Sequence, residues 1–379
     1  MHDKKRYLFI DLLRFLAVIV MLQGHTFDAL LSASIKSHSL YYIHDFFHGF
    51  VAPMFLFASG VAFGVSTFKK WEEFSTLSKA FAKRAARFCG LILLGYALHL
   101  PYFSIHKILY YSTSQAIASF LQVDALHCIA VTLLIVQIAV LFVRQEKTIA
   151  VAAGVIALLI ALTSPLLWSI SLSKYFPLWF VSYINVENNS WFPLFPWSAY
   201  IFGGISFAYL FVNAKEHHHA VRLMQRAVAI GTGCIFIAVI VANIPLGIYP
   251  AHDFWKVNPA VITARFGFIL LVLSGLFFAE HAVRLPSALP SVLGRESLFI
   301  YIINLLLLYG SVINNGLQFY FGSSLTINQA FFVFILLFLT ISSFAYGWHF
   351  LKTNYRGVAL FVRILVLWLL LFYFFTKPY

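Results

Sequence analysis

The sequence predicts an all-α protein that crosses a membrane many times, and three observations support this fold class. Hydrophobic residues make up 61% of the 379-residue chain and charged residues only 10%, whereas about a quarter of an ordinary soluble domain is charged. Apolar runs of about twenty residues, the length of a helix that crosses the hydrocarbon core, recur along the whole chain. Basic residues gather in alternate loops between these runs.

Each apolar run is predicted to be a helix, because a segment in lipid must satisfy its own backbone hydrogen bonds. No soluble domain and no low-complexity linker interrupts the runs, so we predict a single integral-membrane domain over residues 1–379. The eleven predicted spans are residues 8–31, 46–68, 88–103, 122–143, 148–168, 192–213, 227–248, 259–280, 296–313, 327–350 and 357–376.

The net charge of +13 would suit a nucleic-acid-binding protein, but the placement of the basic residues indicates a membrane topology instead. Cytoplasmic loops of membrane proteins are rich in Lys and Arg. If the N-terminus is cytoplasmic, eighteen basic residues lie in cytoplasmic segments and five in external ones. We therefore predict an integral membrane protein with a cytoplasmic N-terminus and an external C-terminus, surrounded by lipid and without a nucleic-acid partner.

No metal site is predicted from the sequence. The three cysteines lie in separate apolar spans without the close spacing of a zinc site or a disulfide framework; they are Cys89, Cys128 and Cys234. The histidine triplet at residues 217–219 falls in a predicted cytoplasmic loop, where we expect it to be solvated.

The first predicted span carries four ionisable residues on one face. At 100° per residue, Asp11, Arg14, His25 and Asp28 fall within an arc of about 100°, and the stripe is about 25 Å long. Ionisable groups inside a membrane usually face a protein interior or a cavity and mark a path for substrate, ion or proton. Asp11 alone is better explained by a pairing with Arg14 at the cytoplasmic edge.

A second polar cluster lies at the predicted external entrance of the second span. His38, His44, Asp45 and His48 are on the same predicted side as His25. An imidazole exchanges protons near neutral pH, and a neighbouring carboxylate can fix its tautomer. Taken singly, each of these histidines is better explained as an interfacial polar residue.

Five segments follow one another along the chain: FIDLLRFLAVIVMLQGHTFDAL, HGFVAPMFLFASGVAFG, VDALHCIAVTLL, WFPLFPWSAYIFGG and LGRESLFIYIINLLLLYG. Together they resemble the bacterial branch of the heparan-α-glucosaminide N-acetyltransferase catalytic-domain family, which implies an acyltransferase-like domain in a bacterial inner membrane. Within the first segment, Arg14 and His25 also match the Arg-x10-His spacing of the wider superfamily of transmembrane acyltransferases.

The resemblance implies transfer of an acyl group, usually acetyl from cytoplasmic acetyl-CoA, to a sugar hydroxyl or amine at or across the membrane. His25 is then the candidate general base, or the nucleophile if an acyl-histidine forms. In the lysosomal animal member the acting histidine lies in the loop before the second span, near the position of His38. His38 and His44 are therefore alternatives to His25, and Arg14 and Asp28 complete the candidate catalytic set.

Basic residues elsewhere are candidates for binding the phosphates of CoA. KAFAKRAARF at residues 79–88 presents Lys83, Arg84 and Arg87, which serve equally well as anchors to anionic lipid. Arg265 lies within the eighth span without a sequence-local partner, and Arg14 also belongs to this candidate set.

Five residues are predicted to support the site or to contact substrate. Asp124 and His127 lie one helical turn apart and are expected to hydrogen-bond, either around a cavity or simply between helices. Trp197 suits stacking on a sugar, although anchoring at the membrane interface explains it as well. The set is Asp11, Asp45, Asp124, His127 and Trp197. Asn304 stands where related acyltransferases often carry a histidine and cannot act as an acid or base.

Two other classes of function explain the sequence less well. In a secondary transporter the charged stripe would be a proton or substrate path, but transporters commonly show two related halves, and we find no internal repeat. A non-catalytic membrane partner would need no stripe. The acceptor, predicted to be a saccharide or glycolipid, and any homo-oligomer are not determined by the sequence.

Overall fold

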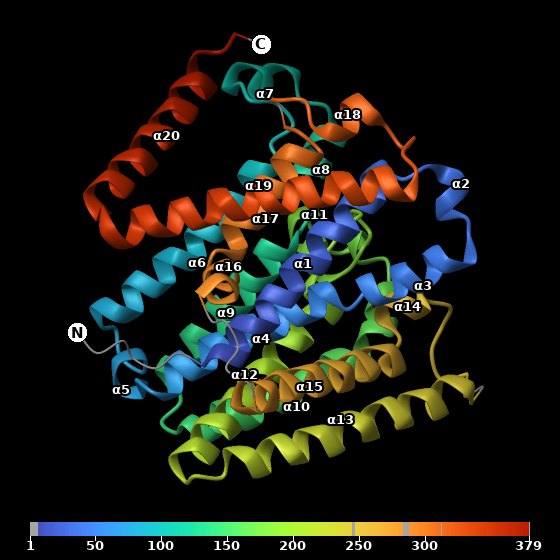
Figure 1. The fold of residues 1–379 in the computed structure, drawn as a ribbon, viewed down its shortest axis with the longest axis vertical. Helices are drawn as coiled ribbons and strands as arrows, with labels where there is room; N and C mark the ends of the chain where they lie inside the picture. The colour runs from blue at the N-terminus through green and yellow to red at the C-terminus, as the bar shows by residue number, and fades with distance from the viewer. Residues whose placement is uncertain (1–6, 245–246, 283–287, 312, 379) are drawn as a thin grey trace. The chain divides into compact units, whose positions relative to one another are not determined.

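The computed structural model describes residues 7–244, 247–282, 288–311 and 313–378, and these residues form helices joined by short loops (Figure 1). The elements are α1 (Leu8–Leu30), α2 (Ala33–Lys36), α3 (Ser39–His48), α4 (Val51–Phe68), α5 (Trp71–Phe74), α6 (Lys79–Leu98), α7 (Ile105–Tyr111), α8 (Ser114–Phe120), α9 (Ala125–Phe142), α10 (Glu146–Ser169), a 3-10 turn (Leu172–Lys174), α11 (Leu178–Ile184), α12 (Leu194–Glu216), α13 (Ala220–Asn243), α14 (Phe254–Val257), α15 (Pro259–Ala282), α16 (Ala288–Arg295), α17 (Ser297–Leu308), α18 (Leu317–Phe321), α19 (Ile327–Asn354) and α20 (Arg356–Thr376).

The all-α, polytopic membrane fold is confirmed. Among the described residues, nine helical segments are long and apolar enough to cross a membrane, and α16 with α17 makes a tenth if this pair, bent by 71°, is one span. These ten coincide with ten of the eleven predicted spans. Lys4, Lys5, Arg6 and Arg284, which contributed to the predicted topology, lie outside the described residues, and the orientation stays a prediction.

The predicted span at residues 88–103 has different bounds in the structure. α6 begins at Lys79 and carries four basic residues in its first half, so it is not among the candidate spans. Its apolar remainder, residues 88–98, is about 16 Å long at 1.5 Å per residue, roughly half the hydrocarbon thickness. The helix stops at Leu98 because Pro101 disfavours helical backbone just before it.

The described chain divides into two compact units. Unit 1 comprises Met1–Val51, Leu100–Ala116 and Ala279–Tyr379, and unit 2 comprises Ala52–His99 and Ile117–Phe278. The single domain expected over the whole chain stays a prediction.

Unit 1 is built around α1, which packs against α16, α17 and α19 (Figure 1). The packing is tight at Gly294, where an added Cβ would overlap the carbonyl oxygen of Asp11. At the other end of α1, the backbone of Ser32 donates to Leu325 at 3.1 Å, and Leu325 donates to Leu30 at 2.9 Å. Both ends of α1 are thereby held in a helical unit, which positions its polar face.

Unit 2 is held together by helix pairs that meet at glycines. A Cβ at Gly60 of α4 would overlap the carbonyl oxygen of Ile201 in α12, and a Cβ at Gly204 would overlap that of Phe57. α13 and α15 run side by side (Figure 1), with Gly231 facing Gly267. Small residues let helix backbones approach closely in membranes, where the hydrophobic effect between helices is absent.

Candidate active site

α1 separates the four residues of its predicted polar stripe into different environments. Asp11 is buried, Arg14 and His25 are partly buried, and Asp28 is exposed near the end of the helix. The first three therefore face the interior of unit 1 at least in part, whereas the Asp28 side chain is 67% exposed and lies 3.9 Å from Lys36 Nζ. Protein therefore encloses the stripe at Asp11 and partly at Arg14 and His25, but not at Asp28.

Asp11 connects α1 to α16. Its Oδ2 accepts a hydrogen bond from Ser291 Oγ at 3.4 Å and lies 3.8 Å from Nε of Arg295. Only 3% of Asp11 is exposed. The buried carboxylate therefore links α1 to α16. The sequence pointed to Arg14 as its partner and did not indicate Arg295.

His25 is enclosed by three side chains of unit 1. Its Nδ1 lies 2.8 Å from Nδ2 of Asn304 on α17. The rings of His48 and Tyr309 stand edge-on to it, each with a centroid separation of 6.0 Å. Asn304 is fully buried, and its Oδ1 has no hydrogen-bond partner among the described residues. Nδ1 of His25 is thus engaged, and Nε2 has no hydrogen bond to any residue that the structure describes.

α3 adds two more imidazoles to this cluster. His44 Nε2 lies 2.9 Å from Oε1 of Gln23, and the rings of His44 and His48 are nearly parallel, 6.2 Å apart. His48 packs directly against Gly24, where a Cβ would overlap its ring. We define the histidine cluster as His25, His44, His48, Gln23 and Asn304.

The roles of Gln23 and Asn304 were missed in the sequence, and His48 was noted only as part of the loop. Two features of the sequence are consistent with this cluster. His44 and His48 lie four residues apart, on one face of a helix, and Gly24, next to His25, has no side chain to block the His48 ring. No local pattern indicates that Asn304, 279 residues away, contacts His25.

Two other predicted residues near the entrance of the second span are exposed. His38 caps α3, and its side chain accepts a hydrogen bond from the Leu40 backbone at 3.3 Å. Asp45 lies on the exposed face of α3. Among the described residues, neither side chain bonds to His25. The ring contacts from His25 to His48 and from His48 to His44 favour His44 over His38 as a neighbour of that imidazole.

Arg84 is engaged within unit 2. Its Nε donates to Gln137 Oε1 at 2.8 Å, its Nη1 donates to Thr67 Oγ1 at 2.9 Å, and its guanidinium lies 3.5 Å from the ring centroid of Phe74. Burial lowers the pKa of Arg84 to about 10, so it stays charged at neutral pH. Arg84 therefore ties α4, α6 and α9 together, whereas Lys83 and Arg87 are exposed.

Arg265 and Trp197 lie together inside unit 2. The guanidinium carbon of Arg265 is 6.0 Å from the Trp197 ring centroid, and both residues are at most 9% exposed. Arg265 Nη1 and Trp197 Nε1 are buried without hydrogen-bond partners among the described residues. The buried indole is poorly placed as an interfacial anchor, and the guanidinium retains a donor for an anionic ligand.

Asp124 and His127 form the hydrogen-bonded pair predicted from their spacing. The carboxylate caps α9 by accepting from the His127 backbone at 3.0 Å, and its Oδ1 lies 2.8 Å from His127 Nδ1. Both residues are buried. The pair is at least a helix cap within unit 2.

The family signature described as "Heparan-alpha-glucosaminide N-acetyltransferase, catalytic" matches residues 6–254, which is well over half of the chain. The chain belongs to this family. No curated protein matches it. The match confirms the resemblance found in the sequence, and it identifies the chain as a member of a family of transmembrane acetyltransferases that generally depend on acetyl-CoA.

The matched region of this N-acetyltransferase family member includes His25, His44 and His48, together with the basic start of α6. Asn304 and Arg265 lie beyond residue 254. The histidine cluster therefore joins side chains from the matched region to one from the C-terminal part of the chain.

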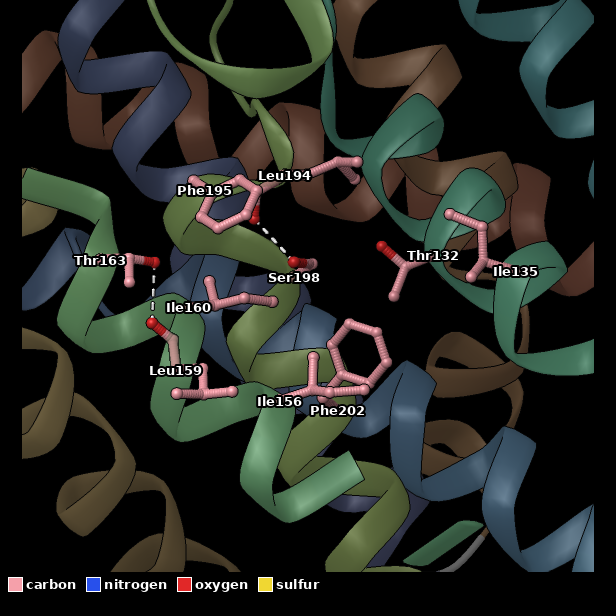
Figure 2. A pocket seen from close by; sticks show the side chains of 10 residues that line it. All are labelled: Thr132, Ile135, Ile156, Leu159, Ile160, Thr163, Leu194, Phe195, Ser198 and Phe202. Atoms are coloured by element: carbon pink, nitrogen blue, oxygen red, sulfur yellow. Dashed lines mark hydrogen bonds between the residues drawn. The ribbon is translucent and has the colours of Figure 1, made fainter. Parts of the chain in front are cut away.

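One cavity of this family member is apolar and lacks the groups for acyl transfer. It has a volume of about 390 Å³ and lies between α9, α10 and α12 (Figure 2). The Thr163 and Ser198 hydroxyls donate to carbonyls of their own helices, Leu159 and Leu194, at 2.8 and 2.7 Å. Its lining holds no imidazole or carboxylate, so it offers no general base, whereas the histidine cluster does.

Proposed function

We propose that this protein transfers an acetyl group from cytoplasmic acetyl-CoA to a hydroxyl or amine of a saccharide, with His25 as the general base. The observation that carries this proposal is the histidine cluster, in which Asn304 engages Nδ1 of a partly buried imidazole and leaves Nε2 free. The family supports the reaction class, and the cluster supports the assignment of residues.

The proposed reaction needs one proton acceptor. His25 Nε2 removes the proton of the acceptor O–H or N–H while the acceptor atom attacks the thioester carbon. The C–S bond breaks, and the sulfur of CoA leaves as a thiolate that takes up the proton. Ping-pong kinetics and a trapped acetyl group would instead indicate an acyl-histidine, with the same imidazole as the nucleophile.

Asn304 is proposed as the residue that fixes the His25 tautomer. Base chemistry at Nε2 requires the neutral ring to carry its proton on Nδ1. A 180° rotation of the Asn304 amide exchanges its two ends, so that Oδ1 accepts this proton. Oδ1 has no other partner among the described residues, which leaves it available for this bond.

Replacing Asn304 tests which end of the amide faces His25. Asn304→Leu should lower kcat roughly tenfold with little change in KM, as expected for one lost hydrogen bond. Asn304→Asp keeps an acceptor and should retain more activity than Asn304→Leu. Steady-state kinetics of purified protein measure both, and equal loss in the two variants would contradict the acceptor role.

The donor side of the proposal rests on exposed and half-enclosed cations. Lys83 and Arg87 are available for CoA phosphates, Arg265 keeps an unpartnered nitrogen, and Arg14 lies on the same helix as His25. Arg84 is less suited, because two of its nitrogens already bind protein.

The double variant Lys83→Gln with Arg87→Gln should weaken acetyl-CoA binding several-fold while the protein folds normally, because both side chains are solvent-exposed. Isothermal titration of purified protein measures the affinity, and Lys174→Gln, an exposed cation in another loop, is the matched control. Unchanged affinity in the double variant would contradict a role in CoA binding and favour anchoring to anionic lipid as the role of both residues.

The function itself is tested by following radiolabelled acetyl from acetyl-CoA into soluble and lipid-linked sugars, in inverted vesicles and in detergent. Transfer that depends on acetyl-CoA supports the proposal. Absence of any transfer, together with solute uptake driven by a pH gradient, would favour the secondary transporter instead. Trp197, Asp124 and His127 stay candidates for acceptor contact or support.

A further inference from the structure

A second polar cluster lies where α6 ends and α9 begins, within unit 2. His99 caps the C-terminus of α6, Asp124 caps the N-terminus of α9, and His127 lies in the first turn of α9. The two helices pack against each other. One donor atom from each of these three residues lies within 4.8 Å of the other two.

Helix capping explains only half of this cluster. His127 Nδ1 lies 2.8 Å from Asp124 Oδ1 and 3.3 Å from the Asp124 backbone nitrogen, and one ring nitrogen cannot donate to the first and accept from the second. The contact with the carboxylate is the shorter of the two and is too close for two lone pairs, so we assign the proton to Nδ1, which donates it to Oδ1. The neutral ring then has a lone pair on Nε2. That atom is buried and has no hydrogen-bond partner among the described residues. His99 Nδ1 is likewise buried and without a hydrogen-bond partner among them.

Two buried imidazole nitrogens without partners beside a buried carboxylate are unusual, because buried polar atoms are nearly always satisfied. A carboxylate that holds the far nitrogen of a histidine is the arrangement that orients histidines toward metal ions. On the α6 side, the Tyr96 ring stands edge-on to the His127 ring at a centroid distance of 4.3 Å. Gly95 gives the imidazole room, because a Cβ there would lie 2.6 Å from His127 Cε1.

We propose that His99 and His127 bind a divalent transition-metal ion of the zinc class, with the Asp124 carboxylate orienting His127 from Nδ1. Imidazole nitrogens suit Zn²⁺, Co²⁺ or Ni²⁺, whereas Mg²⁺ and Ca²⁺ prefer sets of oxygen ligands. The remaining coordination positions are open to water or substrate. The carbonyls at the end of α6 also favour a cation. This inference departs from the sequence-based expectation of no metal.

The experiment must separate this cluster from the exposed triplet His217, His218 and His219, which offers three further imidazoles to added metal ions. The background protein therefore carries Asn at all three triplet positions. Purified full-length protein is stripped with chelator, dialysed and titrated with CoCl₂ and with ZnCl₂. Visible absorption of bound Co²⁺ and the zinc content per chain are the readouts.

We expect one ion per chain in the background protein and a rise in Tm when ZnCl₂ is added. His127→Gln and His99→Gln should each weaken binding by at least tenfold and remove the rise in Tm. His99→Gln keeps the test valid if His127→Gln fails to fold, because His99 takes no part in the Asp124 cap. His252→Gln, at a histidine elsewhere in unit 2, is the control and should bind as the background does.

Binding of no ion by the background protein would overturn the proposal. Equal affinity in the background and in His99→Gln would do so as well, because it would assign the ion to other ligands. Neither outcome bears on acetyl transfer by the histidine cluster, so this proposal and the proposed function fail separately.

Discussion

Replacing His25 with Ala should lower acetyl transfer by a factor on the order of 10² to 10⁴, the range typical of lost general-base catalysis. The imidazole is partly buried and engaged by Asn304, so the substitution removes the proton acceptor without removing a helix cap or an ion pair. His25→Asn should be little better, because an amide hydrogen-bonds but does not accept the proton. Initial rates of radiolabelled acetyl transfer measure the loss.

Two further variants separate His25 from its rivals. His38→Ala removes an exposed cap of α3 and should leave most of the activity, whereas His44→Ala removes a ring of the histidine cluster and should give an intermediate loss. Full turnover by His25→Ala, with loss only in His38→Ala or His44→Ala, would move the catalytic centre to α3.

Arg14→Gln distinguishes binding from chemistry on the same helix. If Arg14 acts through the donor, higher acetyl-CoA should restore its rate, because a loss of binding alone raises KM and leaves kcat unchanged. A fall in kcat that saturating acetyl-CoA does not correct would instead assign Arg14 to the chemical step.

Replacing Gly60 with Ala should strongly destabilise the fold. The new Cβ would overlap the carbonyl oxygen of Ile201, and backbone atoms cannot rotate away as a side chain can. α4 and α12 would have to separate, and overpacking of this kind costs about 1–3 kcal/mol or more. Thermal melting in detergent, read as the fraction that stays monodisperse, measures the effect.

Gly233→Ala is the matched control for this prediction. Gly233 also lies inside a helix, α13, but nothing is within 4 Å of its added Cβ. Alanine is the better helix former by up to about 1 kcal/mol, so this variant should melt at the same temperature or slightly higher. A Gly60→Ala protein as stable as Gly233→Ala would show that α4 and α12 do not approach as closely as described.

The sequence by itself determined the fold class, most of the membrane helices and the family. Their signals are local: an apolar run of twenty residues is a helix in lipid wherever it packs, and ordered motifs need no contacts to be read. The span predicted at residues 88–103 begins and ends later than α6 does. Hydropathy alone recognised neither that the helix begins in the basic segment at Lys79 nor that it ends before Pro101.

The candidate site was determined only in part by the sequence. Helical periodicity indicated that His25 lies on a polar face, and one-turn spacing indicated the Asp124–His127 pair. Both relations lie within one helix, where 100° per residue fixes which side chains are neighbours.

Contacts between distant segments were decided by tertiary structure alone. Asn304 reaches His25 across 279 residues, Arg84 is engaged by Gln137 across 53, and His99 joins Asp124 and His127. No periodicity relates such positions, because the packing of helices, set here by glycines such as Gly24 and Gly95, determines which faces meet. Thus the sequence identified the chemically capable residues, and packing decided which are engaged with protein and which stay free for a ligand.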